Sequence, residues 1–238
     1  MSENTVSTKR ERIAENARNM PQASFTALAH HIDQEWLRVA QQQVRRDGAV
    51  GIDGATAEAY EQNLEENLQD LEDRIKSGRY KAPAVKRVYV PKNQHEKRPI
   101  GIPTYEDKIA QKAIAMVMEA VYEQDFHDFS YGFRPGKSQH MALDRVWQEI
   151  MNMRGAYVID LDISKYFDTI DHTMLRQEVQ KRVRDGVIIR MIGKWLHAGV
   201  MENGRVSHPP AGSPQGGLCK ALHKPPYVKQ PIMRSNTV

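Results

Sequence analysis

Residues 157–168 read YVIDLDISKYFD, and this segment indicates which fold the chain adopts. Alternate residues from Tyr157 to Ile163 are apolar and share one face, which predicts a strand with one side in a core. The other face carries carboxylates and ends at Asp162, beside the backbone carbonyl of Ile163. Such hard oxygen donors hold Mg²⁺ together with substrate phosphates. Taken alone, the pattern is better explained by a buried strand that ends in a solvated acidic turn.

A two-metal site needs more than this strand provides. Two cations about 4 Å apart are bridged by carboxylates from more than one strand. A partner acid is therefore expected elsewhere in the chain.

The composition is that of a globular protein with room for one large domain or two small ones. Apolar residues make up 40% of the 238 positions, the mean hydropathy is −0.65, and no apolar run approaches the ~20 residues of a membrane helix. The polar start of the chain lacks the apolar core of a signal peptide. Cys219 is the single cysteine, which excludes an internal disulfide and a cysteine-based zinc site. We expect a cytoplasmic protein.

The positive charge is concentrated in two places. Of the 34 basic residues, four follow residue 218, where no acid occurs, which leaves 30 to balance the 30 acidic residues. Residues 74–98 contain nine cations against Glu96 alone. That density is typical of a surface that binds a phosphate backbone or a triphosphate, although a solvated charged face has the same composition. The cations are Arg74, Lys76, Arg79, Lys81, Lys86, Arg87, Lys92, Lys97 and Arg98.

Local patterns predict a chain of helices interrupted by two hairpins. The first hairpin has a basic tip, and the second turns at Asn203-Gly204. Residues 1–24 are polar, with at most a helical turn, and residues 219–238 are expected to form no packed element. The nine histidines show no metal-ligand spacing and are assigned no role. Helices are expected over residues 25–44, 56–78, 104–121, 138–153, 172–183 and 187–198, and hairpins over 85–103 and 200–208.

Four segments in this order resemble motifs of the group II intron reverse transcriptases, also called intron-encoded maturases. They are RPIGIPT at 98–104, SYGFRP at 130–135, the strand with Asp162 and Phe167-Asp168, and GSPQGG at 212–217. GIDG at 51–54 and YVPK at 89–92 resemble the N-terminal extension and first motif of that family. The resemblance covers about residues 30–218, and four motifs in the same order make coincidence very improbable.

The resemblance implies a catalytic role for residues of the central segment. Asp162 matches the first catalytic aspartate, which ligates Mg²⁺ together with the carbonyl of Ile163. Phe167 matches the aromatic residue that packs where a ribose 2′-hydroxyl would lie and so selects a dNTP. Asp160 matches no metal ligand and is interpreted as a solvated or hydrogen-bonded acid.

The resemblance also implies contacts to substrate and nucleic acid. Lys92 and Arg98 match the cations that hold the incoming triphosphate. Gln215 matches the glutamine that lies against the nucleotide, where small neighbours permit close approach. With Tyr131, Arg134 is expected to support the template or the fingers. Further nucleic-acid contacts are expected from Arg74, Lys76, Arg79, Lys81, Lys86, Arg87 and Arg134.

The sequence departs from the family pattern after residue 218. In the family, an apolar helix and then a Tyr-Ala-Asp-Asp hairpin with the second pair of catalytic acids follow at this point. The sequence instead reads CKALHKPP at residues 219–226. We therefore expect an α+β chain with fingers (25–155, with the N-terminal extension) and a partial palm (156–218) of a right-hand polymerase. Such a chain would be inactive alone, whereas the intact family uses Mg²⁺, a dNTP, a DNA primer and an RNA template. Alternatives are an RNA-binding fragment that acts on an intron, a degenerate product without a role, and another class of bacterial reverse transcriptase.

Overall fold

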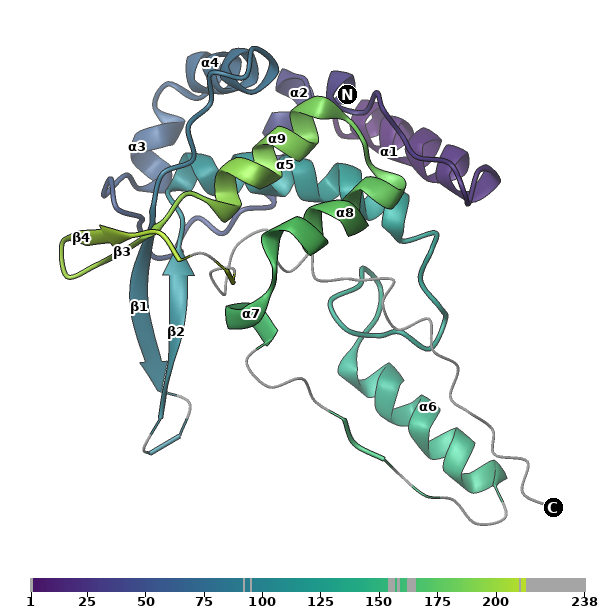
Figure 1. Ribbon diagram of the computed structural model, residues 1–238. Coiled ribbons are helices and arrows are strands. Elements are labelled where there is room, and N and C mark those ends of the chain that lie inside the picture. The colour runs from purple at the N-terminus through teal and green to yellow at the C-terminus, as the bar shows by residue number, and fades with distance from the viewer. Residues whose placement is uncertain are drawn as a thin grey trace.

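The computed structural model describes residues 2–91, 93–94, 96–153, 157, 159–161, 166–209 and 211–212. Its centre is helix α5 (Tyr105–Tyr122), in which fourteen side chains are buried. Thr104 begins α5 as its N-cap by accepting a hydrogen bond from the Asp107 backbone, as the capping-box sequence predicts. Three helices pack against α5: α1 (Ser2–Asn19), α2 (Gln34–Gln42) and α3 (Ala57–Glu61). Figure 1 shows α5 running behind α8 (His172–Arg182) and α9 (Gly186–Leu196).

The N-terminal segment corrects the expectation of at most a helical turn. Helix α1 spans Ser2–Asn19 and packs along α5. Its apolar residues are few, but Val6, Ile13 and Ala17 lie on one stripe and are buried. Lys9 and Arg10 add ion pairs to Asp33 and Glu119, so a helix with few apolar residues is still held in place.

Two predicted helices are divided in the structure. The helix expected over residues 25–44 begins after Asp33, whose side chain caps α2 (Gln34–Gln42), and only the short turn η1 (Ala29–His31) precedes it. Phe25 instead exchanges backbone hydrogen bonds with Arg182 and Arg184. The helix expected over 56–78 is interrupted at Asn63, which separates α3 (Ala57–Glu61) from α4 (Leu64–Lys76).

Both predicted hairpins are confirmed, and they join into one sheet. Strands β1 (Val85–Pro91) and β2 (Lys97–Ile102) are antiparallel. So are β3 (Val200–Glu202) and β4 (Arg205–Ser207), whose turn places Asn203 and Gly204 at positive φ. The unpredicted feature is parallel pairing of β1 with β3, which gives the order β2-β1-β3-β4.

The central strand predicted over residues 157–163 is wrong for the residues that are described. Residues 157 and 159–161 belong to no strand, and Tyr157, Ile159 and Leu161 are 100%, 78% and 88% exposed. A strand with one buried face needs neighbouring strands and a layer beneath it. No described strand pairs with this segment.

Helix α6 (Gln139–Asn152) shares this exposed environment. The structure confirms the predicted helix, yet none of its residues is buried. Figure 1 shows it set apart from the other helices. The remaining helices are α7 (Tyr166–Thr169), α8 (His172–Arg182) and α9 (Gly186–Leu196), and no helix in the described part of the chain has the length and apolarity to cross a bilayer.

Candidate functional site

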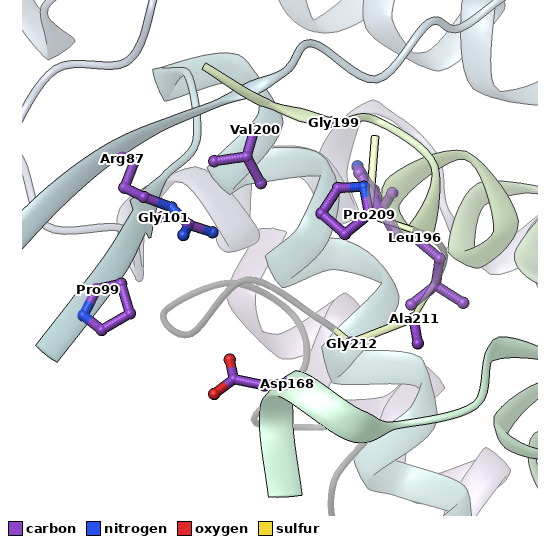
Figure 2. A pocket seen from close by; sticks show the side chains of 11 residues that line it. Arg87, Pro99, Gly101, Asp168, Leu196, Gly199, Val200, Pro209, Ala211 and Gly212 are labelled. Carbon is purple, nitrogen blue, oxygen red and sulfur yellow. The ribbon is translucent and has the colours of Figure 1, made fainter. Parts of the chain in front are cut away.

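A cavity of about 180 Å³ lies where the first hairpin, α7 and the end of α9 meet. Ligand pockets usually exceed ~300 Å³, so this cavity can enclose a part of a nucleotide, such as its base or sugar, and not the whole molecule. Figure 2 shows its lining side chains. They are Arg87, Pro99, Gly101, Asp168, Trp195, Leu196, Gly199, Val200, Pro209, Ala211 and Gly212.

Two opposite charges line an otherwise apolar cavity. Arg87 comes from β1 and Asp168 from α7, and Figure 2 shows them on different sides of the cavity. Neither side chain has a hydrogen-bond or ion-pair partner among the described residues. A free guanidinium binds phosphate or carboxylate oxygens, and a free carboxylate accepts from hydroxyl or amino groups. The site therefore suits a ligand that carries both an anion and polar donors.

The parallel pairing of β1 with β3 builds one wall of this cavity. Val85 donates its backbone N–H to the carbonyl of Gly199 at 3.1 Å, and Val85 and Val200 are register partners. Gly199 has φ +83°, and a Cβ there would lie 2.8 Å from the His208 ring. A glycine is thus required for α9 to end and β3 to begin so close to the hairpin.

A second wall is held by the segment that follows α7. The Gly212 N–H donates to the Ile170 carbonyl at 2.9 Å, and the Gly212 carbonyl lies 2.6 Å from Nε2 of His172. Asp171 caps α8 by accepting from the Met174 backbone. These contacts place the start of the glycine-rich segment beside Asp168.

Several predicted site residues lie outside the described residues: Lys92, Asp162, Ile163 and Gln215. Phe167 belongs to α7, and only its backbone is described. Pro99, Asp168 and Gly212, which lie beside or near Arg98, Phe167 and Gln215 in the sequence, all line the cavity, whereas Leu161, the described neighbour of Asp162, does not. The structure thus brings together parts of the first hairpin, α7 and the start of the glycine-rich segment, and the contacts of Lys92, Asp162, Ile163 and Gln215 stay predictions.

The predicted phosphate-binding cations fall into two groups. Arg79, Lys81, Lys86 and Arg98 are exposed, and Arg87 lines the cavity. Arg74, by contrast, forms a bidentate pair with Glu106 at 2.8 and 3.0 Å and contacts Asp70, while Lys76 pairs with Glu72. These two charges are already balanced within the chain.

Arg134 is also held by the protein. Its guanidinium pairs with Glu123 at 2.7 Å and donates to the carbonyls of His127 and Ser130 at 2.7 and 2.8 Å. It lies over the Phe126 ring at 5.0 Å. As described, Arg134 stabilises the loop between α5 and α6, and its contact with nucleic acid stays a prediction.

Within the described residues, no three His, Cys, Asp or Glu side chains come together as metal ligands. Asp168 is the one carboxylate among the residues that line the cavity. The described side chains alone do not fit a two-metal centre, so the magnesium prediction depends on Asp162 and Ile163.

A buried polar network around Asp107 connects the cavity residue Trp195 to α5. Asp107, 1% exposed, accepts hydrogen bonds from Trp195 at 2.6 Å, from Gln111 at 2.8 Å and from the Tyr80 hydroxyl. Burial raises the pKa of Asp107 to about 6, against the opposing effect of these donors. Because Trp195 also lines the cavity, the network fixes that wall onto α5.

Sequence reasoning missed much of this cavity lining. Asp168 lies in the Phe-Asp motif, which assigns its side chain no role. Gly199 marks the end of a predicted helix, but no local pattern places it or Trp195 at a cavity, because the β1–β3 pairing that brings them to the hairpin is nonlocal.

The family assignment follows from comparison with known proteins. Residues 90–219 match the family model "Reverse transcriptase (RNA-dependent DNA polymerase)", which is more than half of the chain. The chain belongs to the reverse transcriptase family. This reverse transcriptase chain is 36% identical over 224 residues to protein YkfC of Escherichia coli K12. The aligned region covers 91% of this chain and 59% of YkfC.

Relatives encoded by introns confirm the group II resemblance. The chain is 32% identical over 214 residues to the group II intron-encoded protein LtrA of Lactococcus lactis, which covers 89% of this chain and 35% of LtrA. It therefore spans about three fifths of YkfC and one third of LtrA. A solved partial Cas6-RT-Cas1–Cas2 complex matches with a TM-score of 0.50 at 18% identity, over 84% of this chain and 34% of that chain. This likeness confirms the α+β reverse transcriptase fold.

Proposed function

We propose that the cavity is part of a binding site for a deoxynucleoside triphosphate that serves RNA-templated DNA synthesis. The observation that carries the proposal is the convergence of the basic hairpin, α7 and the glycine-rich segment on one cavity. Arg87 binds a phosphate oxygen, and Asp168 accepts a hydrogen bond from a hydroxyl or amino group of the nucleoside. Lys92, Arg98 and Gln215 complete the contacts to the triphosphate and the base.

The reaction served by this site is nucleotidyl transfer, in which a primer 3′-hydroxyl attacks the α-phosphate, a new P–O bond forms and pyrophosphate leaves. Mg²⁺, held by Asp162 and the Ile163 carbonyl, would stabilise negative charge on the phosphates. The described side chains supply binding and orientation. A metal-independent affinity for dATP would contradict the metal part of the proposal.

Nucleotide binding can be measured with Trp195 as a reporter, because its indole lines the cavity. We expect dATP with Mg²⁺ to change the fluorescence of the 238-residue chain, and Trp195→Phe to abolish the change. Arg87→Ala is expected to weaken binding about tenfold or more, since a charge-assisted hydrogen bond is lost. Arg205→Ala, on exposed β4, is the matched control and should bind as the wild type does. Unchanged affinity in Arg87→Ala would overturn the assignment.

The preference for deoxynucleotides is a separate step of the proposal. Phe167 packs against the sugar and excludes a 2′-hydroxyl. Phe167→Val is therefore expected to reduce the ratio of dATP to ATP affinity and to leave dATP binding nearly unchanged. An equal loss for both nucleotides would show that Phe167 only supports the fold.

A second function, binding of RNA along its phosphates, is favoured by exposed cations around the hairpin. Lys81, Lys86, Lys97 and Arg98 are exposed and have no partner among the described residues. Each phosphate contact to a single strand makes the negative slope of log K against log salt concentration steeper by about 0.7. Replacing the three lysines by alanine should reduce the magnitude of that slope by about 2. Lys76→Ala should not change it, because Lys76 is already paired with Glu72.

The same titration tests whether the partner is an intron. Intron RNA should compete better than unrelated RNA of equal length. Equal competition would support nonspecific attraction between charges and contradict specific intron binding.

A further inference from the structure

The wall of the cavity formed by Gly212 is held by a histidine that the proposed chemistry does not use. Nε2 of His172 lies 2.6 Å from the Gly212 carbonyl oxygen. A carbonyl can only accept, so Nε2 carries the hydrogen and donates it. His172 is 9% exposed, which makes this a largely desolvated hydrogen bond.

The other polar group of Gly212 is bound by the same turn of chain. Its N–H donates to the carbonyl of Ile170 at 2.9 Å. Gly212 has φ +87°, a conformation that favours glycine. Both backbone groups of this residue are thus fixed by the two positions 170 and 172, immediately after the helix that carries Asp168. Two lining residues from distant parts of the chain are therefore held in one geometry.

The imidazole ring of His172 is also contacted by a second histidine. The ring of His197 packs edge-on against that of His172, with centroids 5.4 Å apart. Nδ1 of His197, the C-cap residue of α9, donates to the Gly193 carbonyl at 2.7 Å, and Nδ1 of His208 lies 3.2 Å from the His197 carbonyl oxygen. The His172 ring is thus positioned by α9, which also supplies Trp195 and Leu196 to the cavity.

We propose that His172 is a positioning residue for nucleotide binding: its Nε2–H holds Gly212, and with it the start of the glycine-rich segment, against the cavity. This inference rests on the proposed function of the cavity. His172 does not touch the nucleotide. Without its hydrogen bond the Gly212 carbonyl is unpaired, the wall loosens and the nucleotide loses a preorganised surface.

Two substitutions separate the donor from the ring. His172→Phe keeps an aromatic ring beside His197 and removes the donor. His172→Gln places an amide N–H near the position of Nε2 and retains it. His140→Gln, on the exposed surface of α6, is the control for a histidine outside the site.

The test combines dATP titration, hydrogen exchange and thermal unfolding of the 238-residue chain. We expect His172→Phe to bind dATP five- to tenfold more weakly and His172→Gln to bind within about twofold of the wild type. The Gly212 amide should exchange faster in the Phe variant alone. The unfolding temperature shows that the compared variants are folded. Equal binding and exchange in wild type and Phe variant, or equal losses in Phe and Gln variants, would overturn the proposal.

The binding measurements also separate this inference from the function on which it rests. If the wild-type chain does not bind dATP, the proposed function fails and so does the role of His172 in it. If dATP binds and depends on Arg87 but not on the donor at position 172, only the positioning role fails.

Discussion

Asp185 accepts a hydrogen bond from the backbone N–H of Leu28, 157 positions earlier in the chain, at 2.7 Å. The same carboxylate accepts from the Ala29 N–H at 2.9 Å and caps α9 through the N–H groups of Val187 and Ile188. Asp185 is buried. One side chain thus satisfies the first donors of η1 and of α9, and it fixes the helix that ends at the cavity.

Replacing this carboxylate should be among the most destabilising substitutions in the chain. Asp185→Ala leaves four backbone donors without their acceptor, and we expect the free energy of unfolding to fall by about 3 kcal/mol or more. Urea denaturation measures the loss. Asp171→Ala is the matched control, because Asp171 caps α8 from an exposed position and should cost about 1 kcal/mol. Similar losses for both would contradict a bridging role for Asp185.

Gly51 permits close contact between two backbone segments. A Cβ at this position would lie 2.6 Å from Cα and 2.7 Å from N of Thr104, the N-cap of α5. Because these are backbone atoms, we expect Gly51→Ala to destabilise the fold by about 1–3 kcal/mol, as overpacking does. Gly132→Ala meets open space and should stay within about 0.5 kcal/mol of the wild type. Thermal unfolding distinguishes the two, and a neutral Gly51→Ala would disprove the close approach.

The raised pKa of Asp107 predicts a specific pH dependence of stability. Its folded-state pKa of about 6 exceeds the ordinary value of 3.8, so its contribution is fully present below about pH 4 and is lost as the pH rises to about 6. The loss amounts to about 3 kcal/mol. Asp107→Asn cannot ionise and lacks this dependence. The difference in unfolding free energy, wild type minus variant, should therefore decrease from pH 4 to pH 7, and a constant difference would contradict the shift.

The apolar stripe of α6 makes the folded chain prone to associate. Leu143 and Trp147 are 65% and 64% exposed, and Val146 and Ile150 lie on the same face. Replacing Leu143 and Trp147 by glutamine should reduce light scattering and the binding of an apolar dye without lowering the free energy of unfolding by more than about 0.5 kcal/mol. Gln148→Ala, on the opposite face, should change neither. A large loss of stability would show that α6 is packed after all.

Local sequence patterns predicted the elements that depend on neighbouring residues. The periodic residues of α5 and α8, the Asn203-Gly204 turn and the antiparallel hairpin at 85–102 were all visible in the sequence. The attachment of α1 was not visible, because it depends on packing against α5, and the division at Asn63 has no local signal in the sequence. The pairing of Val85 with Val200 joins residues 115 positions apart, and the cavity exists because of it.

For the described residues 157 and 159–161, the local pattern predicted a strand that the structure does not form. The alternation favours a strand, but a strand forms only where another one supplies hydrogen bonds, and none does so among the described residues. For the candidate site, three of the motif segments, around Pro99, Asp168 and Gly212, meet at the cavity, while the roles of Asp162 and Gln215 stay predictions. The motifs could not indicate the contact of His172 with Gly212, because its partner is a backbone carbonyl, which has no sequence signature.

The sheet register has a mechanical consequence. β3 pairs with β1 through Val85 and Lys86, while β1 and β2 run on together to Pro91 and Lys97. The base of the hairpin is therefore fixed to β3 by backbone pairing, and further along β1 the Tyr89 hydroxyl donates a hydrogen bond to Glu202 at 2.5 Å. We expect the far end, where Arg98 pairs with Val90, to bend more easily than this base, so that Arg98, proposed to bind the triphosphate, moves while Gly199 and Val200 stay fixed at the cavity wall.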